Sequence, residues 1–151
     1  MKPSPKGWPR IAPALYYDKP VEAIDWLCRA FGFEVRLKVE GDEGQILHSE
    51  LTFGEGLIMV SGGGARETMP HGAYRKTPAQ VGGANTQNLM LYVDDAEAHC
   101  ARARAAGATI VKEPEVHDYG EDYWADRGYE CVDIGGHHWW IYQRLRDPKN
   151  G

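Results

Sequence analysis

The sequence contains few cysteines, no long apolar run and no surplus of positive charge. Its cysteines, Cys28, Cys100 and Cys131, are odd in number and form no Cys-x-x-Cys pair, so we expect reduced thiols in a cytoplasmic protein. No stretch approaches the length of a membrane span, and residues 1–9 lack the apolar segment of a signal peptide. A formal net charge of −5 disfavours a broad nucleic-acid or anionic-membrane surface. We therefore expect neither nucleic acid nor membrane as a partner.

What the chain does contain is the composition of one globular domain and an internal repeat. It has 151 residues, of which 42% are hydrophobic and 26% charged, as is typical of a single folded domain. In the first half, a predicted strand at 14–17 is followed by a helix that Pro20 opens and Gly32 ends. Three predicted strands come next, at 34–40, 45–53 and 57–61.

The second half repeats this order of elements. A predicted strand at 88–93 leads into a helix in which Asp94 and Glu97 have the spacing of a capping box, and Gly107 ends that helix. Predicted strands follow at 108–111, 129–133 and 138–143. The repeat predicts an α+β fold of two βαβββ modules, which form a curved mixed sheet around a ligand cleft.

Two stretches lack a regular pattern. Residues 62–86 are rich in Gly, Pro and polar residues and predict a connecting loop. Its Gly62-Gly63-Gly64 run lacks the Lys-Ser/Thr that a phosphate-binding loop needs, so a flexible linker is favoured. Residues 114–128 are expected to form a lid or a partner contact and hold three large aromatic residues, Tyr119, Tyr123 and Trp124.

Alternation along the predicted strands separates a helix-facing layer from a ligand-facing layer. Along 45–53, Leu47, Leu51 and Phe53 are expected to face the helix, and Ile46, His48, Glu50 and Thr52 the opposite way. If the opposite faces of the two modules close on each other, they line a shared cavity. Carried across the repeat, this alternation predicts a set of ligand-binding residues: Tyr16, His48, Glu50, Met59, Asn88, Tyr92, Tyr129 and Trp140.

Each candidate has a functional and a structural interpretation. His48 and Glu50 share a strand face and are the candidate catalytic residues, as an acid–base pair or a polar anchor, unless they form an exposed pair on the wetter side of the sheet. The aromatic side chains either stack on a planar or cationic ligand or fill a core. His137 and His138 point to opposite faces, which favours a structural role over a shared metal ion. Cys131 is expected to be an inert buried thiol.

Several motifs resemble the vicinal oxygen chelate superfamily, which includes glyoxalase I, extradiol dioxygenases and bleomycin-resistance proteins. They are AIDW at 23–26, AFGF at 30–33, TPAQVGG at 77–83, YVDD at 92–95, AAGA at 105–108 and DIGGHHW at 133–139. The resemblance runs from about residue 11 to 145 and is strongest to the glyoxalase-like branch. It implies one domain over 10–145, with modules at 10–61 and 87–145 joined by a linker at 62–86. It also implies a cleft between the modules, a small-molecule partner and commonly a homodimer.

Metal-dependent members of that superfamily place a ligand on the first and last strands of each module. The resemblance puts these positions near Ala12 and at Met59, Asn88 and Trp140, which do not make a ligand set for a divalent ion. We therefore expect no cofactor, and a metal-independent protein of the bleomycin-resistance type that sequesters an aromatic or cationic compound. The alternatives are a regulatory or structural module in which the cleft is vestigial, and an enzyme, either a glyoxalase-like lyase or isomerase or a dioxygenase type. In such an enzyme His48 and Glu50 would transfer protons or act as atypical ligands of a divalent metal.

Overall fold

The computed structural model describes residues 1–63 and 73–149, and the chain divides into two compact units, Met1–Ala84 and Asn85–Gly151. The division falls within the predicted linker at 62–86. Gly64, the last residue of the triple-glycine run, lies outside the described residues. In the described part of the chain, no helix has both the length and the apolar character needed to cross a membrane.

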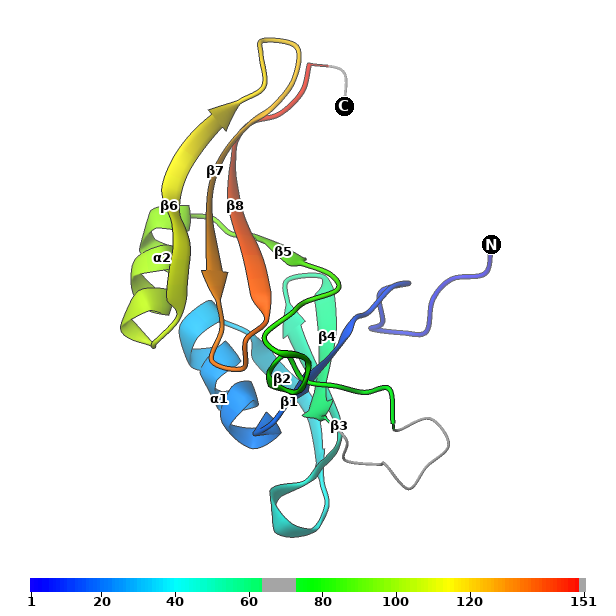
Figure 1. Cartoon of the computed structure of the whole chain (residues 1–151). Coiled ribbons are helices and arrows are strands. Elements are labelled where there is room, and N and C mark those ends of the chain that lie inside the picture. The colour runs from blue at the N-terminus through cyan, green and yellow to red at the C-terminus, as the bar shows by residue number, and fades with distance from the viewer. Residues whose placement is uncertain (64–72, 150–151) are drawn as a thin grey trace. The chain divides into compact units, whose positions relative to one another are not determined.

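The first unit is a four-stranded mixed sheet with helix α1 (Pro20–Phe31) on one face (Figure 1). Its strands are β1 (Ala14–Tyr17), β2 (Glu34–Glu40), β3 (Ile46–Phe53) and β4 (Gly56–Gly62), in the order β1-β4-β3-β2 with β1 parallel to β4. Helix α1 begins at Pro20, whose missing N–H costs nothing in the first turn, and Gly32 ends it in the left-handed conformation, with φ of 88°. Both predicted ends of this helix are confirmed.

An apolar stripe along α1 forms the core of the first unit. Its buried residues are Ala23, Ile24, Trp26, Leu27, Ala30 and Phe31. The sheet contributes a layer that is equally buried, made of Leu15, Tyr17, Leu51, Ile58 and Val60. Alternation sends the intervening residues of the same strands to the other side. We call that side, which carries Tyr16, Glu50, Thr52, Leu57 and Met59, the first distal face.

The second unit repeats this architecture with helix α2 (Ala96–Ala105). Its strands are β5 (Leu89–Tyr92), β6 (Thr109–Asp118), β7 (Ala125–Val132) and β8 (His138–Arg146), in the order β5-β8-β7-β6 with β5 parallel to β8. Figure 1 shows β6, β7 and β8 side by side and continuing beyond the end of α2. The predicted α+β fold of two βαβββ modules is confirmed, and the strands form two four-stranded mixed sheets.

Two predictions about the second unit are wrong. The N-cap of α2 is Asp95 rather than Asp94, because the Asp95 carboxylate accepts the backbone N–H groups of Glu97 and Ala98, each at 3.0 Å. The stretch at 114–128 is mostly regular, since β6 and β7 extend into it as a hairpin. Its aromatic residues lie at the end of this hairpin, where Arg146 Nη1 donates to Asp118 at 3.0 Å and lowers the pKa of that carboxyl to about 2.

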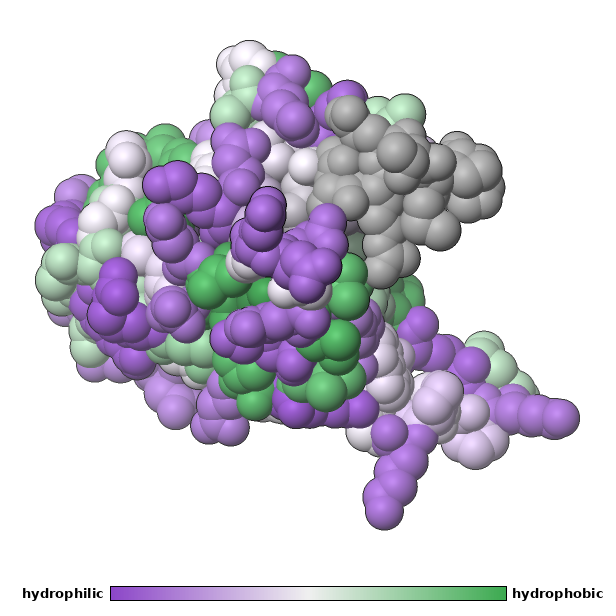
Figure 2. Space-filling model, turned by 90° about the horizontal axis from the view of Figure 1, so that it is seen from below, coloured by the Kyte–Doolittle hydropathy of each residue, from purple (hydrophilic) through white to green (hydrophobic). Residues whose placement is uncertain are grey.

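Bulges in the first sheet change which side chains reach each face. The pairing of β2 with β3 shifts between Val39–His48 and Glu40–Ile46, so Leu47 is an extra residue without a partner in the ladder. Ile46 is buried and Leu47 is exposed, the reverse of the predicted arrangement. The prediction failed because strict alternation does not survive an inserted residue. In the space-filling view of Figure 2, hydrophobic side chains form patches among hydrophilic ones.

Candidate functional site

Glu50 is a buried charge on the first distal face. Its side chain is 7% exposed, and Arg36 Nε lies 3.0 Å from its Oε2. His48 Nε2 lies 2.9 Å from its Oε1, so the two candidate catalytic residues are in contact. A second bulge, between the pairs Val35–Leu51 and Leu37–Glu50, supplies Arg36 as the extra residue beside Glu50. Because a buried carboxylate is costly without a partner, this ion pair accounts for the burial of Glu50.

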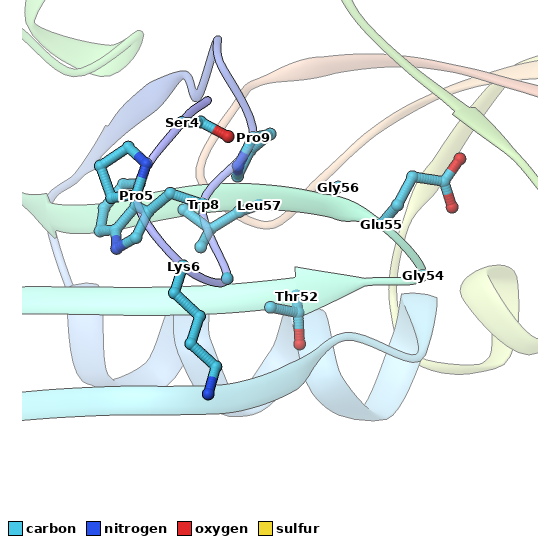
Figure 3. Close-up of a pocket in the computed structure, with 11 residues that line it drawn as sticks. Ser4, Pro5, Lys6, Trp8, Pro9, Thr52, Gly54, Glu55, Gly56 and Leu57 are labelled. Atoms are coloured by element: carbon cyan, nitrogen blue, oxygen red, sulfur yellow. The ribbon is translucent and has the colours of Figure 1, made fainter. Parts of the chain in front are cut away.

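An N-terminal segment (residues 4–9) lies over β3 and β4 on the same face (Figure 3). The backbone N–H of Trp8 donates to the Pro5 carbonyl at 3.0 Å. Gly7 has φ of 75°, as the third residue of a type II turn requires. The turn places the Gly7 carbonyl as an acceptor for Arg36 Nη1, and the Trp8 ring centroid 5.5 Å from Arg36 Cζ. Arg36 is thus held between Glu50 and the N-terminal segment.

A hollow of about 500 Å³ lies between the N-terminal segment and the β3–β4 hairpin. Leu57, Thr52 and the turn at Gly54, Glu55 and Gly56 form the floor, and the N-terminal segment forms the wall. Figure 3 shows Trp8 beside Leu57, with Glu55 at the far end near the turn. Sequence reasoning missed this hollow, because nothing in the pattern of residues 1–9 predicts that they fold back onto the sheet.

Tyr16 and Met59 complete the predicted residues of the first unit. Ala14 pairs with Met59 and Tyr16 with Ser61 in the parallel ladder, which puts Tyr16 and Met59 on one face. Both are half-buried. The Arg75 guanidinium lies over the Tyr16 ring, with Cζ 5.8 Å from its centroid. Arg75, like Arg36, therefore adds a cation in contact with an aromatic ring of this unit.

We call the side of the second sheet that carries Met90, Tyr92, Trp140 and Tyr142 the second distal face. It is more exposed and more aromatic than the first distal face. Met90 pairs with Trp140, and Tyr92 with Tyr142, so these four side chains share one face of neighbouring strands. Gly128 pairs with Tyr142, and an added Cβ at Gly128 would meet that ring at 2.3 Å, so the ring depends on glycine beneath it. Asn88, which directly precedes β5, is exposed.

A buried ion pair supports Tyr92. The Asp126 side chain is 7% exposed, and Arg144 Nε donates to it at 2.6 Å. Arg144 Nη2 donates to the Tyr92 hydroxyl at 2.6 Å, and these hydrogen bonds raise the pKa of the Arg144 guanidinium above its ordinary value. Its Cζ also lies 5.2 Å from the Tyr92 ring centroid. Sequence reasoning missed Asp126 and Arg144 because they meet only through the pairing of β7 with β8.

The structure places Tyr129 on the helix face, not the ligand face. The ladder pairs Tyr129 with Ile141 and Glu130 with Trp140, so Glu130 is the β7 residue beside Trp140. Tyr129 is 1% exposed, and its hydroxyl lies 2.7 Å from Nδ1 of His99 on α2. Burial raises the pKa of Tyr129 well above its ordinary value. The prediction was wrong because it transferred the faces of β3 to β7 one residue out of step, which exchanges the two sides of the strand.

The histidine pair at the β7–β8 turn has a structural setting. Asp133 Oδ1 accepts the backbone N–H groups of Gly135 and His137, at 2.9 and 3.0 Å. Its other oxygen accepts the indole N–H of Trp139 at 2.9 Å. The His138 N–H donates to Asn85 Oδ1 at 3.3 Å. The backbone of this segment is thus fixed by hydrogen bonds around Asp133 and Asn85.

The positions at which the sequence resemblance would place a metal do not fit one here. In the first unit Met59 pairs with Ala14, which lies two residues after Ala12. In the second unit Trp140 pairs with Met90, which lies two residues after Asn88. The register is therefore the same, but the side chains are Ala12 and Met59 in one unit and Asn88 and Trp140 in the other. Within residues 1–63 and 73–149 there is also no group of three or more His, Cys, Asp or Glu side chains suited to a metal ion.

Comparison with known proteins places these features in a family context. The sequence pattern of the Glyoxalase/Bleomycin resistance protein/Dioxygenase superfamily matches residues 10–149. An uncharacterised protein of Mycobacterium bovis is 30% identical over 141 residues, which cover 92% of this chain and 86% of that relative. The crystal structure of TioX from Micromonospora sp. ML1 is similar with a TM-score of 0.68 and 29% identity, over 91% of this chain and all (100%) of that chain.

A second solved structure shares the fold at lower identity. TnmS3, described as an antibiotic binding protein from Streptomyces sp. CB03234, is similar with a TM-score of 0.58 and 17% identity. The similarity covers 88% of this chain and 93% of TnmS3.

Proposed function

The chain belongs to the glyoxalase/bleomycin resistance protein/dioxygenase superfamily, and we propose that it is a metal-independent protein that binds and sequesters an aromatic or cationic small molecule. In this proposal the ligand lies against the apolar and aromatic side chains that the distal face of a unit exposes. Affinity comes from burial of apolar area, at about 25 cal/mol per Å² before the costs of binding. The proposed mode of action is that of the bleomycin-resistance type: the protein binds the compound, removes it from solution and leaves it chemically unchanged.

The observation that carries the proposal is the apolar and aromatic character of the second distal face. Met90, Tyr92 and Trp140 lie on neighbouring strands and are 50%, 44% and 39% exposed. A contiguous exposed group of this kind is typical of a binding surface, and aromatic rings offer stacking partners for a planar ligand. The shared fold with TnmS3, described as an antibiotic binding protein, supports the binding of a small molecule.

The charges on the first distal face favour the aromatic over the cationic class. The Glu50 carboxylate already contacts Arg36 and His48, so a cationic ligand would have to displace Arg36. Arg75 adds a positive charge over Tyr16, and the hollow carries one charge of each sign, Lys6 and Glu55. A cation therefore meets like charge at Arg75 and a carboxylate that is already paired at Glu50. A neutral or acceptor-bearing aromatic compound meets no such penalty.

The contact between His48 and Glu50 favours a second candidate function. An imidazole held 2.9 Å from a carboxylate can accept and donate a proton, and the His48 side chain is 40% exposed and so within reach of a substrate. This geometry suits a glyoxalase-like lyase or isomerase that moves a proton on a small oxygenated compound. Sequestration needs no such transfer, so the two functions predict different outcomes for the same ligand.

A thermal-shift screen of planar aromatic and aromatic cationic compounds against the purified chain tests the proposal. A compound present at 100 times its Kd should stabilise the fold by about 2.7 kcal/mol. We expect hits among the aromatic compounds, with each ligand recovered unchanged by mass spectrometry after prolonged incubation. His48→Gln should leave ligand affinity within about twofold, because the exposed imidazole supplies little of the buried area.

The outcomes separate the candidates. Conversion of a bound compound that disappears in the His48→Gln variant would replace sequestration with catalysis. Hits confined to cations would contradict the aromatic class. Absence of any stabilising compound in both libraries would contradict small-molecule binding.

A further inference from the structure

Arg36, beside Glu50 of the first distal face, contacts an aromatic ring and a carbonyl group of the chain's own N-terminal segment. The Trp8 ring centroid lies 5.5 Å from Arg36 Cζ, and the Gly7 carbonyl oxygen accepts Arg36 Nη1. The guanidinium is fixed from the other side by Glu50, at 3.0 Å from its Nε. The three contacts hold Arg36 as a planar, positively charged platform with one face and one N–H edge used by residues 7 and 8.

The platform lies beside space that a small molecule can enter. The hollow of about 500 Å³ is bounded by Trp8, Leu57 and Thr52, and ligand pockets are typically about 300–1,000 Å³. Leu57 lies on the first distal face, opposite the helix layer of Leu51 and Ile58, because it pairs with Thr52. It is nevertheless buried, and the N-terminal segment lies beside it at the hollow. An apolar floor and a cationic platform therefore lie under one short cover.

The cover is weakly held compared with the platform. Residues 4–9 belong to no helix or strand, whereas Arg36 and Leu57 lie in β2 and β4. The contacts between the segment and Arg36 are a cation–π contact and a hydrogen bond, each of which an incoming ligand can replace in kind. A segment outside the sheet can leave without disturbing the ladder hydrogen bonds.

We infer that residues 7 and 8 occupy a ligand subsite on Arg36, and that the subsite takes a planar aromatic compound bearing a carbonyl acceptor. The inference rests on the proposed function and deepens it by naming the ligand class. The ligand stacks on the guanidinium in place of the Trp8 indole and accepts the Arg36 N–H in place of the Gly7 carbonyl. The N-terminal segment is displaced, and the remaining area of the ligand covers Leu57 in its place.

The test compares binding of N-acetyl-L-tryptophanamide, which carries an indole and carbonyl groups, to the full chain and to Trp8→Ala. Removal of the internal occupant should tighten binding about tenfold, because the binding-competent state no longer has to be opened first. Trp124→Ala is the matched control, since Trp124 also contacts an arginine, with Arg144 Cζ 6.0 Å from its ring, but lies in the other unit. It should bind as the parent chain does.

The charge of the probe tests the ligand class. Tryptamine carries the same indole with an ammonium group and no carbonyl. It should bind Trp8→Ala at least about tenfold more weakly than the amide, because it offers no acceptor for the Arg36 N–H and brings its ammonium group beside the guanidinium. Adding Arg36→Lys to Trp8→Ala should remove the gain, since lysine keeps the charge but loses the planar face and the forked N–H groups. Preference for tryptamine would overturn the class assigned to the subsite.

A measurement on the unaltered chain covers the case in which Trp8→Ala folds poorly. The indole N–H signal of Trp8, identified by its loss in Trp8→Phe, should shift when the amide saturates the protein. Equal affinity of the parent chain and Trp8→Ala, or an unmoved Trp8 signal at saturation, would overturn the self-occupied subsite and leave sequestration intact. Failure of both chains to bind any aromatic compound would instead contradict the proposed function itself.

Discussion

Among the described residues, each unit has a carboxylate that is buried on the distal side and paired with an arginine. Glu50 with Arg36 and Asp126 with Arg144 have the same exposures, 7% for each acid and 32% for each arginine. Each arginine also contacts an aromatic ring, Trp8 or Tyr92. Burial of a charge is tolerated only with such a partner. The arginines nevertheless come from non-equivalent strands, β2 and β8, so the module repeat does not extend to these residues.

The buried thiols provide a prediction at the level of single residues. Burial raises the pKa of Cys131 to about 12, and it raises the pKa of Cys28 and Cys100 above their ordinary value as well. The thiolate is the reactive form, so at pH 8 Cys131 in the folded chain should be almost fully protonated and inert. We expect the half-buried Cys28 to react first with Ellman's reagent, and all three thiols to react once urea unfolds the chain.

The variant Cys28→Ser isolates the two buried thiols for that experiment. It should show almost no reaction at pH 8 in native buffer. Rapid labelling of Cys131 without denaturant would contradict the burial described for β7.

At the level of elements, helix boundaries were predictable where one residue decides them. Pro20 and Gly32 bound α1 as their backbone preferences require. The start of α2 was misplaced by one residue because Asp94 and Asp95 are both good N-caps and only the folded backbone chooses between them. The two faces of β5 were predictable from alternation. In β2 and β3 an inserted residue, Arg36 or Leu47, reverses the faces of the residues beyond it, and no sequence pattern marks such a bulge.

The N-cap of α2 yields a prediction with a matched control. Asp95→Ala removes the acceptor for the N–H groups of Glu97 and Ala98 and should lower the free energy of unfolding by about 1 kcal/mol. Asp94→Ala changes the neighbouring exposed aspartate, which does not cap the helix, and should have an effect within about 0.5 kcal/mol. Urea denaturation followed by circular dichroism measures both. A larger effect for Asp94 than for Asp95 would contradict the observed cap.

At the level of the whole molecule, the fold could be predicted from the repeated order of elements, but much of the candidate site could not. His48 and Glu50 were predicted to share a face and are in contact. Arg36, Trp8 and Asp126 were missed because their contacts depend on a bulge, a folded-back terminus and a strand register. Tyr129 was assigned to the wrong face for a related reason, since a single step in register exchanges the two faces of a strand.

The central claim also concerns the whole molecule: ligand binding depends on aromatic surface and not on a metal. Neither Ala12 with Met59 nor Asn88 with Trp140 offers a ligand set, whereas Met90, Tyr92 and Trp140 present apolar area. Metal-free binding then predicts that chelation changes nothing, because no coordinating group takes part. A metal-dependent site would lose its ligand together with its ion.

The most direct measurement is titration calorimetry with the aromatic compound that stabilises the chain most, before and after exhaustive dialysis against EDTA, with metal content determined on both samples. We expect the same Kd and binding enthalpy in both titrations, with metal far below one ion per chain. Stoichiometric Zn, Ni, Mn or Fe in the purified protein, or binding that chelation abolishes and added metal restores, would contradict the account.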